Sequence, residues 1–204
     1  MKDILLPRGY LSYSAMSLFK SDYNRFVRRY YEQEDSGFST KATEFGSLFA
    51  DQLKSGKKTG NPVFDTVLAT VPKYAKKEHE IRATLPSSKG NIPLLIELDT
   101  YNPKTHAFLD YKTGRTKWTH AKVQSTEQMK YYATALYLKH KVWEQDKSIV
   151  WVETEDEDGI RFTGHIQQFP FTMTLPEILR YARYISGMAL SVSEDYKRYI
   201  KQLV

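Results

Sequence analysis

Hydrophobic and polar residues alternate most clearly in two neighbouring stretches near the middle of the chain. Residues 91–101 read NIPLLIELDTY and residues 107–112 read AFLDYK, and this period of two is typical of β-strands. The four residues Asn102-Pro103-Lys104-Thr105 between them favour a turn. Residues 78–85 alternate more weakly and predict a preceding strand. The three segments together predict an antiparallel meander.

Apolar residues at three- and four-residue spacing predict helices on both sides of this meander. Thr174 and Glu177 form a capping box at the start of the last helix, and Gly56 favours the end of an earlier one. The expected helices are residues 11–31 (one or two helices, capped by Ser12 or Ser14), 43–54, 64–70, 125–140 and 174–203. Further strands are expected at 149–153 and 160–169, with loops at 32–40 and 155–159.

The order of helix, three strands, helix, strands and helix predicts an α/β fold with a mixed central sheet flanked by helices. The chain has 204 residues, and no stretch rich in Pro, Gly or Ser divides it. We therefore expect a single domain over residues 1–204. In that domain residues 1–40 form an N-terminal helical cover, 41–170 the core and 171–204 the C-terminal helix.

The net charge of +6 is concentrated in one part of the chain. Residues 41–140 carry 16 basic and 9 acidic side chains, a net charge of +7, whereas residues 141–204 carry 8 and 10. Localised positive charge favours binding to a polyanion such as DNA, although a solvated lysine-rich surface would give the same count. Candidate DNA contacts are the arginines of the first helical segment and the basic stretch after residue 114: Arg25, Arg28, Arg29, Arg115, Lys117 and Trp118.

The absence of cysteine excludes disulfides, thiolate zinc sites, iron–sulfur clusters and a cysteine nucleophile. Any metal must therefore bind oxygen or imidazole ligands. The N-terminus lacks the apolar core of a signal peptide, and no apolar run approaches 18 residues. We expect an intracellular protein that does not bind membranes.

The candidate site lies on the two central strands. If Asn102 pairs with Ala107 across the turn, Asp99 lies opposite Asp110 and Glu97 lies opposite Lys112. Opposed carboxylates destabilise a sheet unless a partner neutralises them, and Mg²⁺ or Mn²⁺ prefers such oxygen ligands. A slip of one residue would separate the two aspartates, and an isolated Asp-x-Lys is usually an exposed strand pair.

The segments IELD, DYKTG and QMKYYA, in this order and spacing, resemble the RecB-like branch of the PD-(D/E)XK nuclease superfamily, which includes phage exonucleases. The resemblance covers about residues 11–140 and implies a restriction-endonuclease-like core. It also implies that Asp99 and Asp110 bind the metal, that the backbone carbonyl of Tyr111 adds a ligand, and that Lys112 assists the attacking water.

The same resemblance implies that Gln128 and Tyr132 line the site from a helix. Their spacing of four residues agrees, because it places both side chains on one helix face. Two alternatives remain: Ser125 and Gln128 also form a capping-box pattern, and Tyr132 is compatible with a core position.

One feature of the family is missing. The pattern Gly-x-x-x-His, which supplies a metal-binding histidine from a helix, has Ala50 at the histidine position after Gly46. Asp51, Glu44 and Glu97 are the acids considered as substitutes.

The expected function is a Mg²⁺- or Mn²⁺-dependent DNA nuclease, specifically an exonuclease for DNA processing or recombination. The alternatives are a structure-specific endonuclease and a catalytically inactive nucleic-acid-binding or inhibitory module of the same fold. The expected partners are DNA and a recombinase, helicase or single-strand-binding protein, in the cytoplasm of a bacterium or a phage-infected cell.

Overall fold

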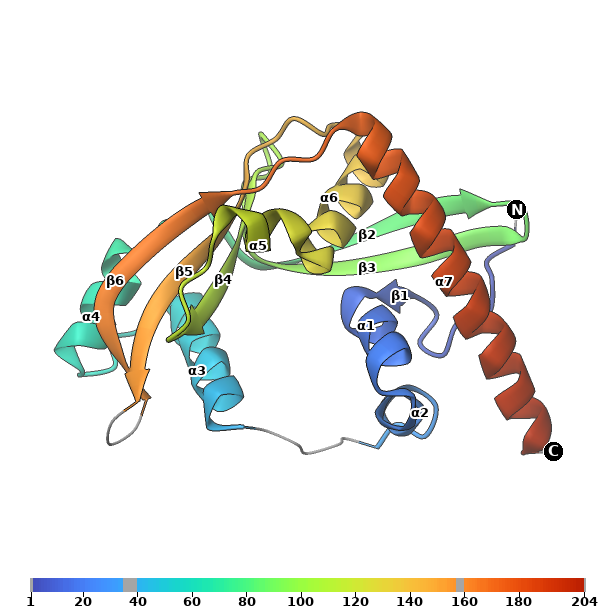
Figure 1. The fold of residues 1–204 in the computed structure, drawn as a ribbon, viewed down its shortest axis with the longest axis horizontal. Coiled ribbons are helices and arrows are strands. Elements are labelled where there is room, and N and C mark those ends of the chain that lie inside the picture. The colour runs from blue at the N-terminus through green and yellow to red at the C-terminus, as the bar shows by residue number, and fades with distance from the viewer. Residues whose placement is uncertain (1, 35–39, 157–159, 204) are drawn as a thin grey trace.

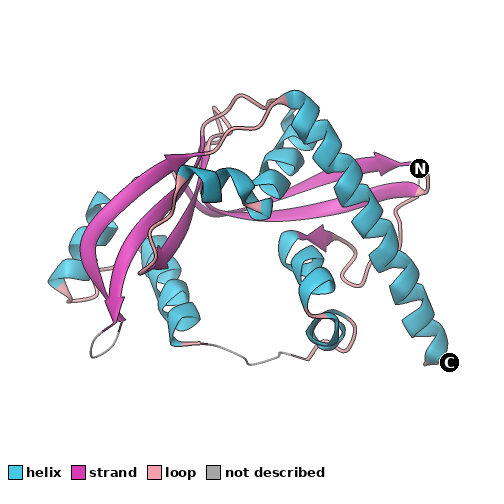
Figure 2. Ribbon diagram, in the orientation of Figure 1, coloured by secondary structure: helices cyan, strands magenta, loops and turns pink. Residues whose placement is uncertain are grey.

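The predicted α/β class is confirmed by the computed structural model, which describes residues 2–34, 40–156 and 160–203. The described part contains one mixed sheet of six strands with helices packed against it (Figures 1 and 2). In chain order the elements are β1 (Leu11–Ser12), α1 (Tyr13–Ser21), α2 (Tyr23–Tyr30), α3 (Lys41–Ser55), α4 (Pro62–Thr70), β2 (Lys76–Ser87), β3 (Gly90–Tyr101), β4 (Phe108–Gly114), α5 (His120–Ser125), α6 (Glu127–His140), β5 (Lys147–Asp156), β6 (Ile160–Pro170) and α7 (Leu175–Gln202).

Strands β2, β3 and β4 form the predicted antiparallel meander. The pairs between β3 and β4 are Thr100 with Leu109 and Tyr101 with Phe108, which is the predicted register. Strand β4 then pairs in parallel with β5, and β5 pairs antiparallel with β6. The two-residue strand β1, which the sequence did not predict, pairs in parallel with β3. The sheet is therefore mixed, as expected.

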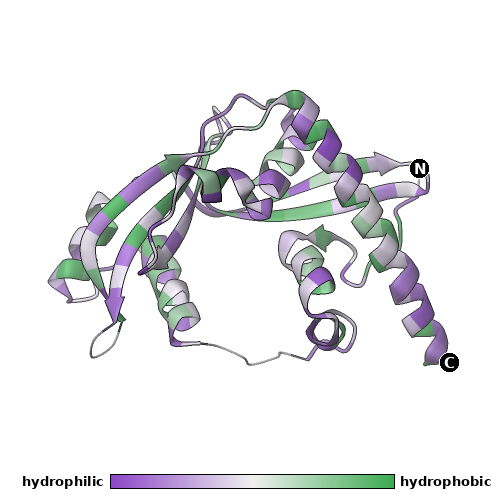
Figure 3. Cartoon of the chain, in the orientation of Figure 1, coloured by the Kyte–Doolittle hydropathy of each residue, from purple (hydrophilic) through white to green (hydrophobic). Residues whose placement is uncertain are grey.

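Two clusters of buried side chains lie on the two faces of the sheet. The larger cluster packs α1, α2, α5, α6 and α7 against one face and includes Phe26, Tyr131 and Trp151. The smaller cluster packs α3 and α4 against the other face of β4–β6 and includes Phe49 and Phe64. The first six residues of β5 are all buried because both faces of this strand are covered, while bands of hydrophilic and hydrophobic residues follow one another along β6 (Figure 3).

The segment predicted as one or two helices over residues 11–31 forms two, and the helix predicted over 125–140 starts later than expected. Asp22 ends α1 and begins α2, where its side chain accepts a hydrogen bond from the Arg25 N–H. Ser12, rather than Ser14, caps α1. The helix expected from residue 125 begins instead after Thr126 and follows the separate helix α5.

Glycines mark two close approaches. A Cβ atom at Gly46 in α3 would lie 3.4 Å from Thr113 Oγ1, so this helix runs directly against β4. Gly90 has φ +140°, and a Cβ atom there would lie 2.6 Å from the carbonyl oxygen of Lys2.

Residues 32–34 and 40 lie outside helices and strands, as predicted, whereas residues 155 and 156 of the loop expected at 155–159 belong to β5. The rest of both predicted loops, 35–39 and 157–159, lies outside the described residues. No helix within the described ranges is both long enough and apolar enough to cross a membrane.

Candidate active site

Strand β4 presents Asp110 and Lys112 on the face that α6 covers. The intervening residue Tyr111 points the other way, where its ring packs edge-on against Phe49 of α3 with ring centroids 5.7 Å apart. Lys112 Nζ lies 2.8 Å from Asp110 Oδ2. The Asp110 side chain is 6% exposed and that of Lys112 is 30% exposed, so the ion pair is shielded but reachable.

Asp99 reaches the same centre because β3 and β4 separate beyond Thr100. There the N–H of Tyr111 donates to Asp99 Oδ2 at 2.7 Å, so the carboxylate takes the place of a backbone carbonyl oxygen of β3 as the acceptor. Asp99 and Asp110 are therefore not paired across the strands as predicted, and the side chain of Asp99 contacts the backbone of Tyr111 instead. The predicted pairing of Glu97 with Lys112 is wrong, because within the described residues β3 and β4 pair only at Thr100–Leu109 and Tyr101–Phe108.

Competition between strands explains that separation. Strand β3 pairs with β2 along its whole length and with β1 at Leu94 and Leu95. Strand β4 pairs with β5 through all seven of its residues. The two strands thus follow different partners and share only the two pairs nearest the turn. The resulting gap in the sheet is where the acidic side chains converge.

Gln128 of α6 joins the lysine, the aspartate and the tyrosine. Its Oε1 accepts from Lys112 Nζ at 3.0 Å, and its Nε2 donates to Asp110 Oδ1 at 3.1 Å and to Tyr132 Oη at 2.9 Å. The capping-box alternative with Ser125 is wrong, since Ser125 donates instead to the carbonyl oxygen of Lys122. Tyr132 is 8% exposed and packs in the core while its hydroxyl reaches this network.

Burial and neighbouring charges shift the pKa values of Asp99, Lys112 and Tyr132. Burial, and then the nearby charge of Asp110, raises the pKa of Asp99 to about 7. Burial alone lowers the pKa of Lys112, but the charge and hydrogen bond of Asp110 and the charge of Asp99 outweigh it, and the net pKa is raised. Lys112 is therefore a protonated ammonium at neutral pH. Burial, followed by the charge of Asp110, also raises the pKa of Tyr132.

The two aspartates fit a divalent cation of the Mg²⁺ type. Asp110 Oδ2 is buried, and within the described residues the Lys112 ammonium at 2.8 Å is its one polar partner. Two carboxylates with added water and substrate oxygens are a usual ligand set for Mg²⁺. Within the described residues, however, no three His, Cys, Asp or Glu side chains gather closely enough to form a metal site.

The substitutes considered for the missing histidine do not complete such a set. Ala50, Asp51 and Glu44 are all exposed on α3. Glu97 is exposed but lies on the site's side, because its charge contributes to the raised pKa of Tyr132. Of the three acids, Glu97 is therefore the one that faces the candidate centre.

A hollow of about 290 Å³ adjoins the network beside Gln128, Tyr132 and Glu97. Arg8 and Arg29 line it, and their guanidinium carbons lie 4.6 Å and 5.8 Å from the ring centroid of Tyr30. Sequence reasoning missed Arg8, because it is the pairing of Leu11 and Ser12 with β3 that brings this segment here. A lone arginine before a glycine carries no local signal of this placement.

The predicted DNA contacts are only partly brought to the centre. Arg29 lines the hollow, whereas Arg25 and Arg28 do not. Arg115 and Lys117 are exposed on the segment that follows β4. Trp118 is partly buried, and the ammonium of Lys122 lies 4.2 Å from its ring centroid.

Comparison with known proteins shows the fold of the chain. No protein-family model matches it, and no curated protein sequence matches it. The crystal structure of a "Putative exonuclease" from Eubacterium rectale is similar with a TM-score of 0.58 and 13% sequence identity, covering 92% of this chain and 82% of that one. The structure of a phage related exonuclease from Haemophilus somnus 129PT gives a TM-score of 0.47 and 14% identity, covering 91% and 83%. The chain thus shares the overall α/β architecture of the Eubacterium rectale protein.

Proposed function

We propose that this protein is a metal-dependent DNA nuclease of the RecB-like branch of the PD-(D/E)XK superfamily, and that it acts as an exonuclease. The observation that carries the proposal is the shared ammonium of Lys112, which lies beside Asp110 and donates to Gln128 while Asp99 lies across the gap in the sheet. At 13% sequence identity, the similarity to the Eubacterium rectale structure supports the fold and not the activity. The chemistry is therefore argued from the side chains.

Lys112 has one N–H to spare. An ammonium has three hydrogens, and two of them are directed to Asp110 and Gln128. The third is available to a phosphate oxygen or to an attacking water. Since the side chain remains partly exposed, this cation can stabilise the negative charge that develops on a phosphate during hydrolysis.

Gln128 acts as a positioning residue and Tyr132 as a donor to substrate. Both amide hydrogens of Gln128 are already used, by Asp110 and Tyr132, so the amide holds its neighbours and has none left for substrate. Because the Tyr132 oxygen accepts from Gln128, the phenolic hydrogen remains free to donate. Its raised pKa keeps that hydrogen in place at physiological pH.

Asp99 and Asp110 would hold Mg²⁺ or Mn²⁺, with the backbone oxygen of Tyr111 as an additional ligand. The cation supplies Lewis acidity that polarises a phosphoryl oxygen and favours ionisation of an attacking water. Because the pKa of Asp99 lies near 7, this carboxyl group would have to release a proton before it could hold a cation at mildly acidic pH.

A second function has its own supporting observation. Within the described residues, no third acidic or histidine ligand joins the two aspartates. This observation favours a nucleic-acid-binding or inhibitory module that has the same fold and no catalytic activity. Such a module binds DNA in a salt-sensitive manner and cleaves none with any divalent cation.

Cleavage of end-labelled linear DNA and of closed circular DNA tests these alternatives, with Mg²⁺, Mn²⁺ or EDTA. We expect degradation of linear DNA only, and its loss in EDTA, in Lys112→Ala and in Asp110→Ala. Lys104→Ala, in the exposed turn between β3 and β4, is the matched control and should retain activity. Undiminished cleavage by either site variant would refute the assignment, and cutting of circular DNA would indicate an endonuclease.

We further propose that the protein acts in the cytoplasm of a bacterium or phage-infected cell, together with a recombinase, helicase or single-strand-binding protein. The absence from this sequence of a Gly-x-x-x-x-Gly-Lys-Ser/Thr motif supports a partner for any unwinding. Copurification with a named candidate partner from the native host tests that part of the proposal.

A further inference from the structure

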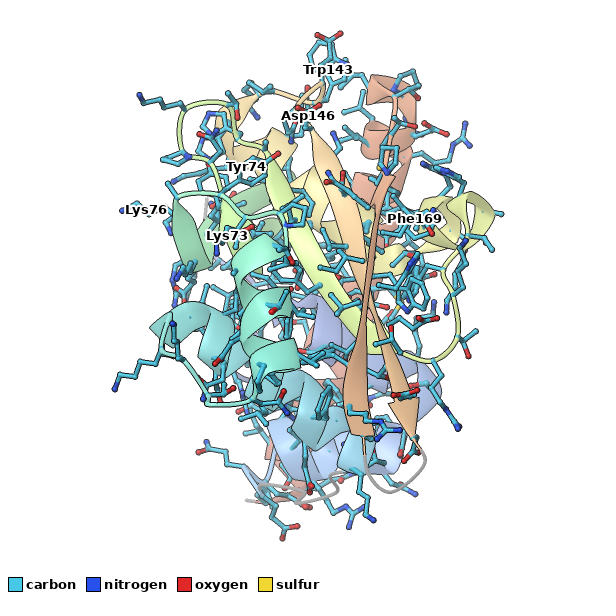
Figure 4. All side chains as sticks on the ribbon, turned by 90° about the vertical axis from the view of Figure 1, so that its left-hand side faces the viewer. Lys73, Tyr74, Lys76, Trp143, Asp146 and Phe169 are labelled. Atoms are coloured by element: carbon cyan, nitrogen blue, oxygen red, sulfur yellow. The ribbon has the colours of Figure 1, made fainter. Side chains whose placement is uncertain are left out.

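A second hollow, of about 200 Å³, lies where the ends of α3 and α4 meet the start of β2. Four lysines from three segments line it: Lys57, Lys58, Lys73 and Lys77. Figure 4 looks onto this side of the molecule and shows Lys73 beside the end of α4 and Lys76 at the start of β2. The hollow therefore collects positive charge from the α3–α4 connection and from the chain entering β2.

Few negative groups offset these charges. Asp65 is the one carboxylate among the residues that line the hollow, and it accepts hydrogen bonds from the N–H and hydroxyl of Thr59 and from the N–H of Gly60. Those bonds to Thr59, ahead of the charge of Lys58, lower its pKa. Among the described residues, none of the four lysines forms an ion pair with a carboxylate. The nearby Glu78 pairs with Lys54 instead.

This hollow lies on a different side of the sheet from the candidate active site. Leu53 and Leu68, which form part of its wall, belong to the smaller core cluster that covers the face opposite α6. Asp110 and Lys112 contact Gln128 on the α6 side. A ligand in the hollow therefore cannot be the phosphate that reacts at these residues.

We propose that this lysine hollow binds a backbone phosphate of nucleic acid, away from the reacting bond. A polyanion suits lysines that share a hollow and form no ion pair, because the phosphates it binds there release condensed counterions. A free phosphate compound has the same chemistry. Lysine side chains are flexible and lack the rigid bidentate donor geometry with which arginine binds a small anion. A phosphodiester chain, which can contact several lysines at once, is therefore the better match. The choice of nucleic acid rests on the proposed function.

Salt-dependent binding of a 30-mer DNA in EDTA tests the proposal without any cleavage. The variant replaces Lys57, Lys58, Lys73 and Lys77 with glutamine. The matched control makes the same substitution at four exposed lysines elsewhere: Lys89, Lys104, Lys197 and Lys201. Both proteins lose the same net charge, so a difference between them reports position and not overall charge.

We expect the hollow variant to reduce the slope of log affinity against log salt by about 2 to 4, since each lost phosphate contact changes it by about 1. The control should change the slope by less than about 1. Lys73 Nζ also donates to the carbonyl oxygen of Leu68. For this reason a second variant that retains Lys73 and changes the other three lysines guards against a loss of folding.

Equal slopes in the hollow variant and the control would overturn the proposal. Calorimetric binding of inorganic phosphate by the wild type but not by the variant, with unchanged DNA binding, would assign the hollow to a free phosphate compound and also overturn it. Failure of cleavage by the wild type is a separate outcome, because it refutes the proposed nuclease and leaves the binding comparison unaffected.

Discussion

Replacing Asp99 with asparagine is expected to stabilise the metal-free protein at pH 8 and to abolish cleavage. The Asp99 carboxylate accepts a hydrogen bond from the Tyr111 N–H, and the Oδ1 atom of asparagine can accept the same bond. The substitution therefore removes a charge while it retains shape and the hydrogen bond. What changes is the cost of holding an ionised carboxylate close to Asp110.

The magnitude follows from the pKa of Asp99, which rises from 3.8 when solvated to about 7 in the folded protein. Between these values the folded state binds a proton that the unfolded state has released, so the free energy of unfolding falls as pH rises through this window. Each unit corresponds to about 1.4 kcal/mol, which gives about 4 kcal/mol for the whole shift. Because Asp99 is partly exposed to solvent, we expect about 2 to 4 kcal/mol.

Urea unfolding in EDTA at pH 4.5 and pH 8 measures this effect. The wild type and Asp99→Asn should have similar stability at pH 4.5, and the variant should be the more stable at pH 8. Adding Mg²⁺ at pH 8 should stabilise the wild type and have little effect on the variant. Asp51→Asn, at an exposed position on α3, controls for the loss of one negative charge. Equal or lower stability of Asp99→Asn at pH 8 would refute the reasoning.

Other substitutions test the positioning of the site, the turn and a histidine pair. Gln128→Ala should slow DNA cleavage about 10- to 100-fold under single-turnover conditions without preventing folding, because the amide orients groups that contact substrate; an unchanged rate would contradict its role. Gly90→Ala should lower the free energy of unfolding by about 1 to 3 kcal/mol, because the added Cβ would lie 2.6 Å from a backbone oxygen. The control is Gly164→Ala, which should lower it less, because Gly164 has φ +90° but no atom close to the added Cβ. Burial, and then the charge of His106, lowers the pKa of His140, so stability should fall as pH drops below 6.5, and thermal melts of His140→Gln should show a weaker loss at pH 5.

The parts of the site predicted from sequence are those that local rules determine. Strand alternation and the Asn102 turn fix the register at Thr100 and Leu109, because a short turn leaves few ways to pair its flanking residues. The four-residue spacing of Gln128 and Tyr132 places both on one helix face, and the hydrogen bond between them follows.

The parts that sequence reasoning missed depend on contacts between distant segments. The separation of β3 from β4 results from the pairing of β3 with β1 and of β4 with β5, and no residue near the turn signals either. The start of α6 is also determined in this way. Thr126 Oγ1 donates back to the carbonyl oxygen of Lys122 in α5, so the expected cap at Ser125 does not form.

The electrostatics of the centre favour chemistry over binding alone. A module that only binds nucleic acid gains nothing from a second carboxylate close to Asp110, and asparagine at residue 99 would keep the Tyr111 hydrogen bond without the charge. Aspartate at this position costs stability at neutral pH, because its pKa lies near 7. The Lys112 ammonium offsets the charge of Asp110 and leaves that of Asp99 for a cation to neutralise. A charge that destabilises the metal-free protein and that a divalent cation would neutralise is expected at a catalytic site. The charge of Asp99 therefore supports a nuclease, despite the alanine at residue 50.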